Sequence, residues 1–392
     1  MRRHRLGASL SLALLLAVAA GVGGVVWQSA QKAREARRAA ATRDFLLGIF
    51  QGGDPRVPRS KPRGQTTARE LLDLAAARID HDLRDDPETR LELLDLTATS
   101  YLYLDELPKA REFARLAKEA GAEEYAADDP RQIDLVFFEI WADLQASDRP
   151  AAAAHLSQLD QSLRQAGLDH SRHRAEYFLA QGDLAQLDKD PAGREKALRE
   201  AAALFAEVAP EDSGYPATLA NLAAIAFNRD QLERAAELYQ TALTAALKRP
   251  EAELERTRLA SRRGRVLTEL GRYQEAENDL TRARRGFAAT LGQDHPTAWQ
   301  ATAALARLNC LEGRHQEADA LFATLPSERP GESPGLAERW AEAKLLQGLC
   351  LAQRPDHQAE GARLLRETSA ILAGQAEAQA DLRRAAAALA AL

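Results

Sequence analysis

Arginine side chains offer the clearest chemistry in this sequence of 392 residues. Arg258 and Arg262 are four positions apart, so on a helix they project from the same face. Two neighbouring guanidinium groups can hold a carboxylate through forked, charge-assisted hydrogen bonds. With Asn221, Arg265 and Arg307 they form the candidate partner-binding set. The alternative is a solvated basic helix and an asparagine with a local structural role.

Cysteine and histidine residues suggest less. Cys310 and Cys350 can form a disulfide bond if their Cα atoms come within about 7 Å, and they are otherwise two buried thiols. His170 and His173 are three positions apart, with His155 upstream. A zinc site needs three or four converging ligands, so we interpret these histidines as polar residues near a helix start. We expect neither a metal nor a cofactor.

Signatures of catalysis are missing from the sequence. It contains no phosphate-binding glycine-rich loop, no nucleophile elbow and no acid/base pair with a local pattern. Its net charge of −6 argues against general nucleic-acid binding, because such proteins are normally basic. We therefore expect a binding protein that is not an enzyme.

A fixed spacing of small residues predicts the elements that position the arginines. In three stretches, which begin at Leu219, Leu259 and Thr302, a small residue is followed twelve positions later by an alanine. Two helices joined by a tight turn approach closely only where side chains are small, and such pairs must stack to bury their apolar faces. The small pairs, with their turn and large residues, are Ala223/Ala235 (Asp230, Tyr239), Gly264/Ala276 (Gly271, Leu280) and Ala306/Ala318 (Gly313, Phe322).

Weaker copies extend this pattern to residues 67–392. The spacing of about 42 residues predicts roughly seven helix pairs in an all-α, right-handed superhelix. The last pair begins at Gly348, with its partner shifted to Ala359 or Ala362. The other weaker pairs are Ala98/Ala110, Ala185/Ala197 and Trp141/Ala153, the last with a bulky residue at the small position.

The stretch LGRYQEAENDL, at 270–280, resembles the tetratricopeptide repeat. The long period and the connection GQDHP, at 292–296, resemble the repeats of kinesin light chains. The resemblance implies a concave face, lined by the first helix of each pair, that binds a peptide or protein. The arginines and asparagine above resemble part of the carboxylate clamp of chaperone-binding members. Gly182 and Gln186, however, stand where the clamp has lysine and asparagine.

The front of the chain predicts a membrane anchor. Residues 6–27 are uncharged, follow three arginines and are long enough to cross a bilayer. A cleaved signal peptide is the alternative, since Ala17-Val18-Ala19 could be a cleavage site. The expected order is a cytoplasmic start, a transmembrane helix, a juxtamembrane helix, a flexible linker and the repeat domain, at 1–5, 6–27, 28–51, 52–66 and 67–392. We expect a single-pass inner-membrane protein with its repeats outside the cytoplasm.

A second resemblance concerns the same region. The stretches ATRDFLLGIFQGGDP, at 41–55, and TTARELLDLAAARIDHDL, at 66–83, resemble the segment after the kinase domain in bacterial serine/threonine kinases with tetratricopeptide repeats. No kinase domain is present in this sequence. We expect a membrane-anchored scaffold, assembly factor or sensor that binds a peptide or protein. The alternative is the sensor part of a split kinase system, with a kinase or other signalling partner.

Overall fold

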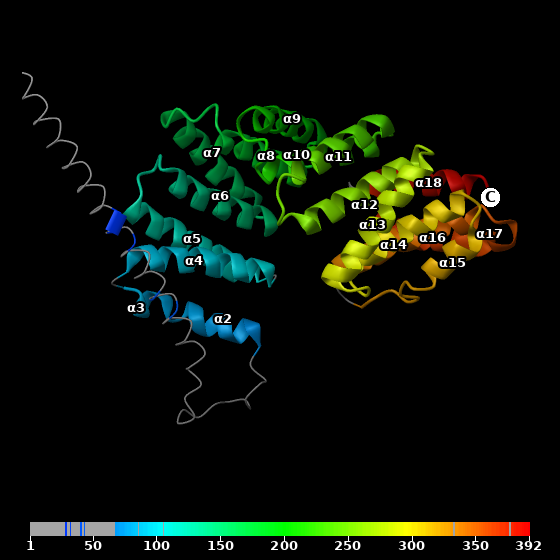
Figure 1. The fold of residues 1–392 in the computed structure, drawn as a ribbon, viewed down its shortest axis with the longest axis horizontal. Helices are drawn as coiled ribbons and strands as arrows, with labels where there is room; N and C mark the ends of the chain where they lie inside the picture. The colour runs from blue at the N-terminus through cyan, green and yellow to red at the C-terminus, as the bar shows by residue number, and fades with distance from the viewer. Residues whose placement is uncertain are drawn as a thin grey trace, which may run out of the picture. The chain divides into compact units, whose positions relative to one another are not determined.

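The computed structural model describes residues 67–84, 86–104, 106–331, 334–375 and 378–392, and five isolated positions before them (28, 29, 32, 40 and 43). Helices make up the secondary structure of this part of the chain, and it contains no strand. The chain divides into two compact units, Met1–Ser162 (unit 1) and Leu163–Leu392 (unit 2). Figure 1 shows the helices in chain order.

The structure contradicts the predicted localisation in the inner membrane. No helix within the described residues is both long and apolar enough to span a membrane. The segments at 1–5, 6–27 and 52–66 lie outside the described residues, as does most of 28–51. The prediction of a single-pass inner-membrane protein, which depended on 6–27, is therefore withdrawn.

Unit 1 begins with a short helix whose start is explained by its sequence. The Thr67 side chain accepts a hydrogen bond from the Glu70 backbone, and the Glu70 side chain accepts one from the Thr67 backbone, which is a capping box. Apolar side chains of the next helices, such as Leu94, are buried against it. The helices are α2 (Ala68–Ala76), α3 (Ile79–Asp82), α4 (Pro87–Tyr103), α5 (Leu107–Glu124), α6 (Pro130–Gln145) and α7 (Arg149–Gln165), whose last residues belong to unit 2.

Unit 2 consists of five consecutive helix pairs, the short turn η1 (Pro355–His357) and a final helix. Each pair packs on the next and shares one apolar core with it from α10 onward. The helices are α8 (Arg172–Leu187), α9 (Pro191–Val208), α10 (Gly214–Asn228), α11 (Leu232–Ala246), α12 (Glu253–Glu269), α13 (Tyr273–Leu291), α14 (Pro296–Leu311), α15 (His315–Phe322), α16 (Pro334–Ala352), α17 (Gln358–Leu372) and α18 (Gln379–Ala390).

The strong repeat pairs meet where the sequence predicts. Ala223 and Ala235 are completely buried, as are Ala306 and Ala318. At the third crossing, a Cβ atom on Gly264 would lie 2.6 Å from Leu280 Cγ, which no real contact allows. The large residues expected behind the crossings are also buried, namely Tyr239, Leu280 and Phe322. Small side chains therefore do set the close approach of the paired helices.

The register of two weaker pairs differs from the prediction. Ser147, Lys189 and Asp230 have left-handed backbone, with φ of 55°, 56° and 60°. Asp230 comes seven residues after the small residue of its pair, Ala223. Seven residues before Ser147 is Ile140, and seven residues before Lys189 is Gly182. Ile140 is completely buried, and a Cβ atom on Gly182 would lie 3.1 Å from Leu198 Cγ.

The crossing residues are therefore Ile140 and Gly182, not Trp141 and Ala185. Trp141 is 41% exposed, which is incompatible with a close helix crossing. With the corrected register, the first residues of the crossings are 98, 140, 182, 223, 264 and 306, so their spacing is 41 or 42 residues throughout. The left-handed residue marks the register better than the alanines, which are too common in this chain to be specific.

In the last pair, α16 and α17 cross at two glycines and not at the predicted alanines. A Cβ atom on Gly361 would lie 2.5 Å from the Ala352 backbone nitrogen, and one on Gly348 would lie 3.0 Å from Leu365. Ala359 is exposed, and Ala362, although buried, is not the contact residue. Two facing glycines bring the backbones of α16 and α17 together.

Candidate functional site

A cavity of about 520 Å³ lies among the helices of unit 2. Arg258, Arg262 and Arg265 line it from α12, and Arg339 and Glu342 line it from α16. These side chains come from the first helix of each pair, because the period returns equivalent positions to the same surface. The other lining residues are Ala224, Phe227, Tyr239, Ser261, Val266, Phe287, Thr297, Gln300, Gly335, Glu338, Gln375, Ala378 and Asp381.

Three arginines of the cavity, Arg258, Arg262 and Arg339, lie close enough for their charges to interact. Burial lowers the pKa of Arg258, and the neighbouring charges of Arg262 and Arg339 lower it further. Among the described residues, neither Arg258 nor Arg262 has a hydrogen-bond or ion-pair partner, while Arg339 reaches Gln300 Oε1 at 3.4 Å. Three like charges that repel one another favour an anion between them.

Two acidic residues of the cavity, Glu338 and Glu342, already have hydrogen-bond partners. Gln300 donates a hydrogen bond to Glu342, and burial raises the pKa of Glu342. The Gln375 side chain donates to Glu338 Oε1 at 2.6 Å. Arg258, Gln300 and Glu342 follow one another at intervals of 42 residues, so they occupy the same position of successive repeats. This position therefore carries a cation, an amide and an acid in turn, and the last two are hydrogen-bonded to each other.

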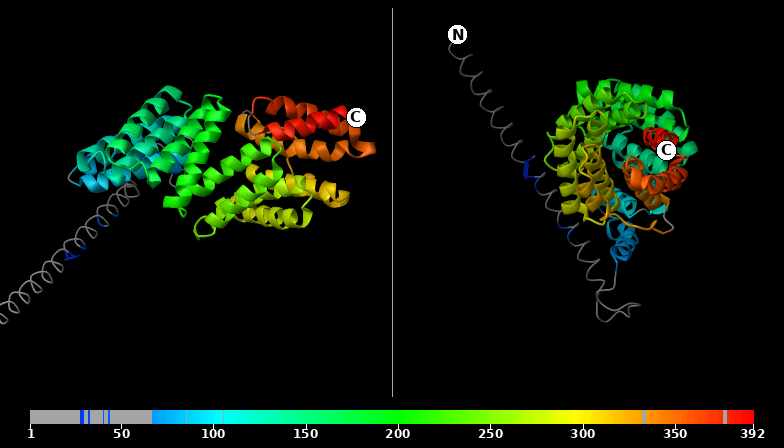
Figure 2. Two further views of the ribbon diagram at one scale, coloured as in Figure 1. Left: turned by 90° about the horizontal axis from the view of Figure 1, so that it is seen from above. Right: turned by 90° about the vertical axis from the view of Figure 1, so that its right-hand side faces the viewer.

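The C-terminal helix α18 occupies part of the inner surface of unit 2. In the end-on view it lies inside the curve of the green-to-orange helices (Figure 2, right). Asp381 Oδ2 accepts a hydrogen bond from Arg265 Nη2 at 2.5 Å, and this charge raises the pKa of Arg265. At the preceding residue, the Ala380 backbone N–H donates a hydrogen bond to Asn228 Oδ1 at 3.2 Å. The cavity thus already contains one carboxylate of its own chain, that of Asp381.

Arg384 holds the same helix through contacts next to Asp381, whose Oδ1 atom lies 3.6 Å from Arg384 Nη1. Its Nε atom lies 3.0 Å from Glu269 Oε2, and its guanidinium group stacks 4.8 Å from the centre of the Phe227 ring. A cation over an aromatic face is stabilised by the ring quadrupole. Arg383 adds a hydrogen bond at 2.5 Å to the backbone oxygen of Asn228.

The structure brings together three of the five expected partner-binding residues. Arg258, Arg262 and Arg265 line the cavity, and Arg265 among them is paired with Asp381. Asn221 does not line it. Arg307 is buried, its Nη1 atom lies 3.5 Å from the Leu349 backbone oxygen, and burial lowers its pKa.

Sequence reasoning missed Arg339 and Asp381. Arg339 lies one helical turn before the position equivalent to Arg258, so the repeat register did not select it. Asp381 lies on a helix outside the repeats, and no periodic signal could place it against Arg265. Of the expected histidines, His155 bonds to Asp143 at 2.8 Å and His170 lies 3.2 Å from Glu207, so both have acidic neighbours.

The comparison with family models agrees with this geometry. The model described as "Tetratricopeptide repeat" matches residues 255–324, which contain most of α12 and α13–α15. The described chain is thus an all-helical array of tetratricopeptide-like pairs, as the resemblance implied. No curated protein sequence matches the chain. The expected link to a protein kinase gains no support from the comparisons.

Solved structures show similar helical arrays. BtubC (BKLC) from P. vanneervenii is 19% identical, with a TM-score of 0.46, covering 58% of this chain and 94% of that one. A Rap protein complexed with Competence and Sporulation Factor is 15% identical, with a TM-score of 0.46 and coverages of 91% and 97%. The apo form of RapI is 14% identical, with a TM-score of 0.49 and coverages of 90% and 97%. Similarity of this degree says nothing about what the chain binds.

Proposed function

We propose that unit 2 binds an acidic segment of a peptide or protein partner in the cavity between α12 and α16. Arg258, Arg262 and Arg339 contact a carboxylate of the ligand. The role is binding and not catalysis. The observation that carries this proposal is the pair of guanidinium groups, on Arg258 and Arg262, that face the cavity without a partner among the described residues.

The ion pair between Arg265 and Asp381 supports the same chemistry. A helix carrying an aspartate fits against the inner surface of unit 2, and its carboxylate meets an arginine one helical turn from Arg262. An acidic ligand would use the remaining arginines in the same way. Forked guanidinium–carboxylate contacts are strong and directional, which suits recognition of a short acidic segment.

A defined probe tests this proposal. The full chain is titrated into fluorescein-labelled deca-glutamate, with labelled deca-glutamine as the neutral control, and fluorescence anisotropy is recorded. Charge reversal in the double variant Arg258→Glu with Arg262→Glu is expected to weaken binding of the acidic peptide at least about tenfold. The same double variant should lose a native partner in a pulldown from the source lysate.

A matched control separates the site from net charge. Arg284→Glu with Arg366→Glu makes the same change in charge at two exposed positions that do not line the cavity. This control is expected to bind the acidic peptide within about twofold of the unaltered chain, because distant surface charges are screened. Equal binding by the two double variants, with circular dichroism showing both folded, overturns the proposal.

A further inference from the structure

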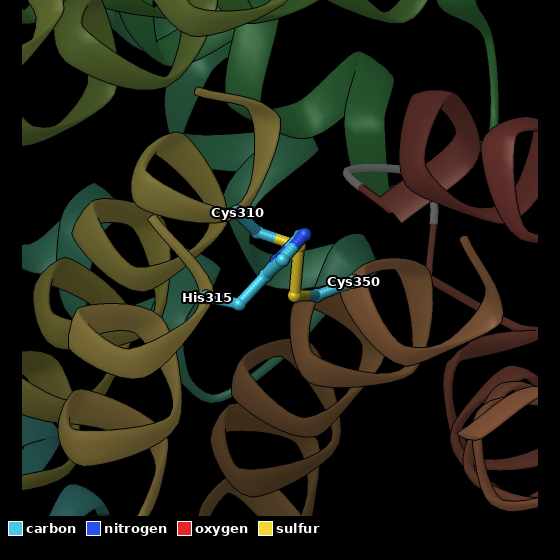
Figure 3. A group of neighbouring side chains, drawn as sticks. All are labelled: Cys310, His315 and Cys350. Atoms are coloured by element: carbon cyan, nitrogen blue, oxygen red, sulfur yellow. A yellow bond between two sulfur atoms is a disulfide. The ribbon is translucent and has the colours of Figure 1, made fainter. Parts of the chain in front are cut away.

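Cys310, Cys350 and His315 meet at one point between three helices (Figure 3). Cys310 lies near the end of α14, Cys350 near the end of α16, and His315 is the first residue of α15. The two cysteines form a disulfide bond with a Cα–Cα distance of 5.9 Å. Cys310 Sγ also lies 3.9 Å from His315 Nδ1.

The distances among these donors suit a metal ion as well as a disulfide. All three ligand atoms lie within 4.8 Å of one another. Zinc bonds of about 2.3 Å to sulfur and 2.0–2.1 Å to nitrogen place tetrahedral donors roughly 3.5–3.8 Å apart. The Cys310–His315 separation is already close to this value. The two sulfur atoms reach it once the bond between them is broken, through small side-chain rotations.

The chemistry and the exposure of the three donors also favour a metal ion. The cysteines are 3% and 0% exposed, so the sulfur atoms lie in a protected site, whereas His315 is exposed. An ion can therefore enter from the imidazole side. Two thiolates and one imidazole are soft and borderline ligands that favour zinc over calcium or magnesium.

We propose that the reduced chain binds one Zn²⁺ through Cys310 Sγ, Cys350 Sγ and His315 Nδ1, with a water molecule as fourth ligand. A dithiol reductant breaks the sulfur–sulfur bond, supplies two electrons and two protons, and itself becomes a disulfide. Zinc then displaces the two thiol protons to solvent as both sulfurs bind as thiolates. Oxidation by a disulfide-class oxidant reverses the sequence and releases the ion.

The disulfide in the oxidised chain and the zinc ion in the reduced chain each link α14 to α16. The reduced, metal-free chain has neither link. These two helices also carry Gln300, Arg339 and Glu342 of the cavity, in their first halves. The site thus acts as a redox-dependent clip on the pair of helices that shapes the cavity. Its three ligands do not line the cavity, so zinc binding can be measured apart from the proposed peptide binding.

Cobalt(II) is the probe, because it replaces zinc and absorbs light. The full chain is reduced anaerobically, freed of reductant and titrated with Co²⁺. We expect one equivalent to bind, with a thiolate-to-cobalt charge-transfer band and the visible bands of tetrahedral cobalt, and zinc to remove both. The oxidised chain is expected to show neither band.

Variants identify the ligands. Cys310→Ser with Cys350→Ser should abolish the charge-transfer band, and His315→Asn should weaken Co²⁺ binding at least about tenfold. His170→Asn, at a histidine far from the site in sequence, is the matched control and should bind like the unaltered chain. Absence of the band in the reduced, folded chain, or equal affinity of the His315 and His170 variants, overturns the proposal.

Discussion

Arg265 and Asp381 are 116 residues apart in sequence, and their side chains form an ion pair at 2.5 Å. The contact joins the middle of the repeat array to the helix that follows it. Because both side chains are largely buried, with exposed fractions of 26% and 12%, solvent screens the pair less than a surface pair. The position of α18 on the inner surface therefore depends on charge as well as on apolar packing.

Removal of the acid at this contact should open the groove. In Asp381→Asn, Arg265 loses its ion-pair partner, and its guanidinium group can then contact an acidic ligand together with Arg258 and Arg262. We expect affinity for labelled deca-glutamate to rise about threefold to tenfold, and the free energy of unfolding to fall by roughly 1–2 kcal/mol. Amide exchange of α18 should quicken. Glu367→Gln, at the exposed partner of Arg363, is the control and should change neither quantity. Unchanged affinity would show that α18 does not compete with an acidic ligand.

The close crossing at Gly264 gives a test of packing. In Gly264→Ala the new methyl group meets the Leu280 side chain at 2.6 Å, so either this side chain or the crossing of α12 and α13 must shift. We expect a loss of about 1–3 kcal/mol in urea denaturation. Gly335→Ala, which meets no atom within 4 Å at the start of α16, should be neutral or slightly stabilising. Equal stability of the two variants would contradict the role assigned to the small residue.

Much of the fold is readable from the sequence because a single physical constraint recurs. Close helix crossings require small residues, and the strong pairs, such as Ala223 with Ala235, show this plainly. The weak pairs were misplaced because alanine is so abundant that a neighbouring turn of the helix also offered one, as at Ala185. The conformation that fixes the register is a left-handed backbone at Lys189, and lysine gives no hint of this in sequence.

That left-handed residue gives a further prediction. Lys189, with φ of 56°, lies two residues after the end of α8, and a side chain at such a position costs roughly 1 kcal/mol. Lys189→Gly should raise the free energy of unfolding by about 0.5–1 kcal/mol, measured by urea denaturation. The converse change, Gly271→Ala at φ of 75° with open space around it, should lower it by a similar amount. A destabilised Lys189→Gly would show that another interaction of the lysine outweighs its backbone strain.

The candidate site is less predictable than the fold. Helical spacing predicts that Arg258 and Arg262 share a face, an inference that needs only local geometry, and both residues line the cavity. It could not show that Arg307 is buried or that Asp381 neutralises Arg265. Those facts depend on the packing of later helices onto the inner surface, and α18 follows no repeat. Periodicity therefore predicts which residues share a face, but it does not predict what covers them.

Asp183 on α8 connects burial to pH. Burial raises the pKa of its carboxyl group from 3.8 to about 6, and the charge of Arg194 only partly opposes this shift. The folded state therefore binds more protons than the unfolded state between these values, so stability falls as pH rises from about 4 to 6. Above pH 6 the ionised group costs roughly 1–3 kcal/mol. Asp183→Asn should recover most of this loss of stability at pH 7. It should also remove the decrease in stability between pH 4 and 6, measured as unfolding free energy at pH 4, 5, 6 and 7. Asp356→Asn, on the exposed turn η1, is the control and should leave the slope intact. An unchanged slope in the Asp183 variant would mean that the carboxyl group is solvated in the native state.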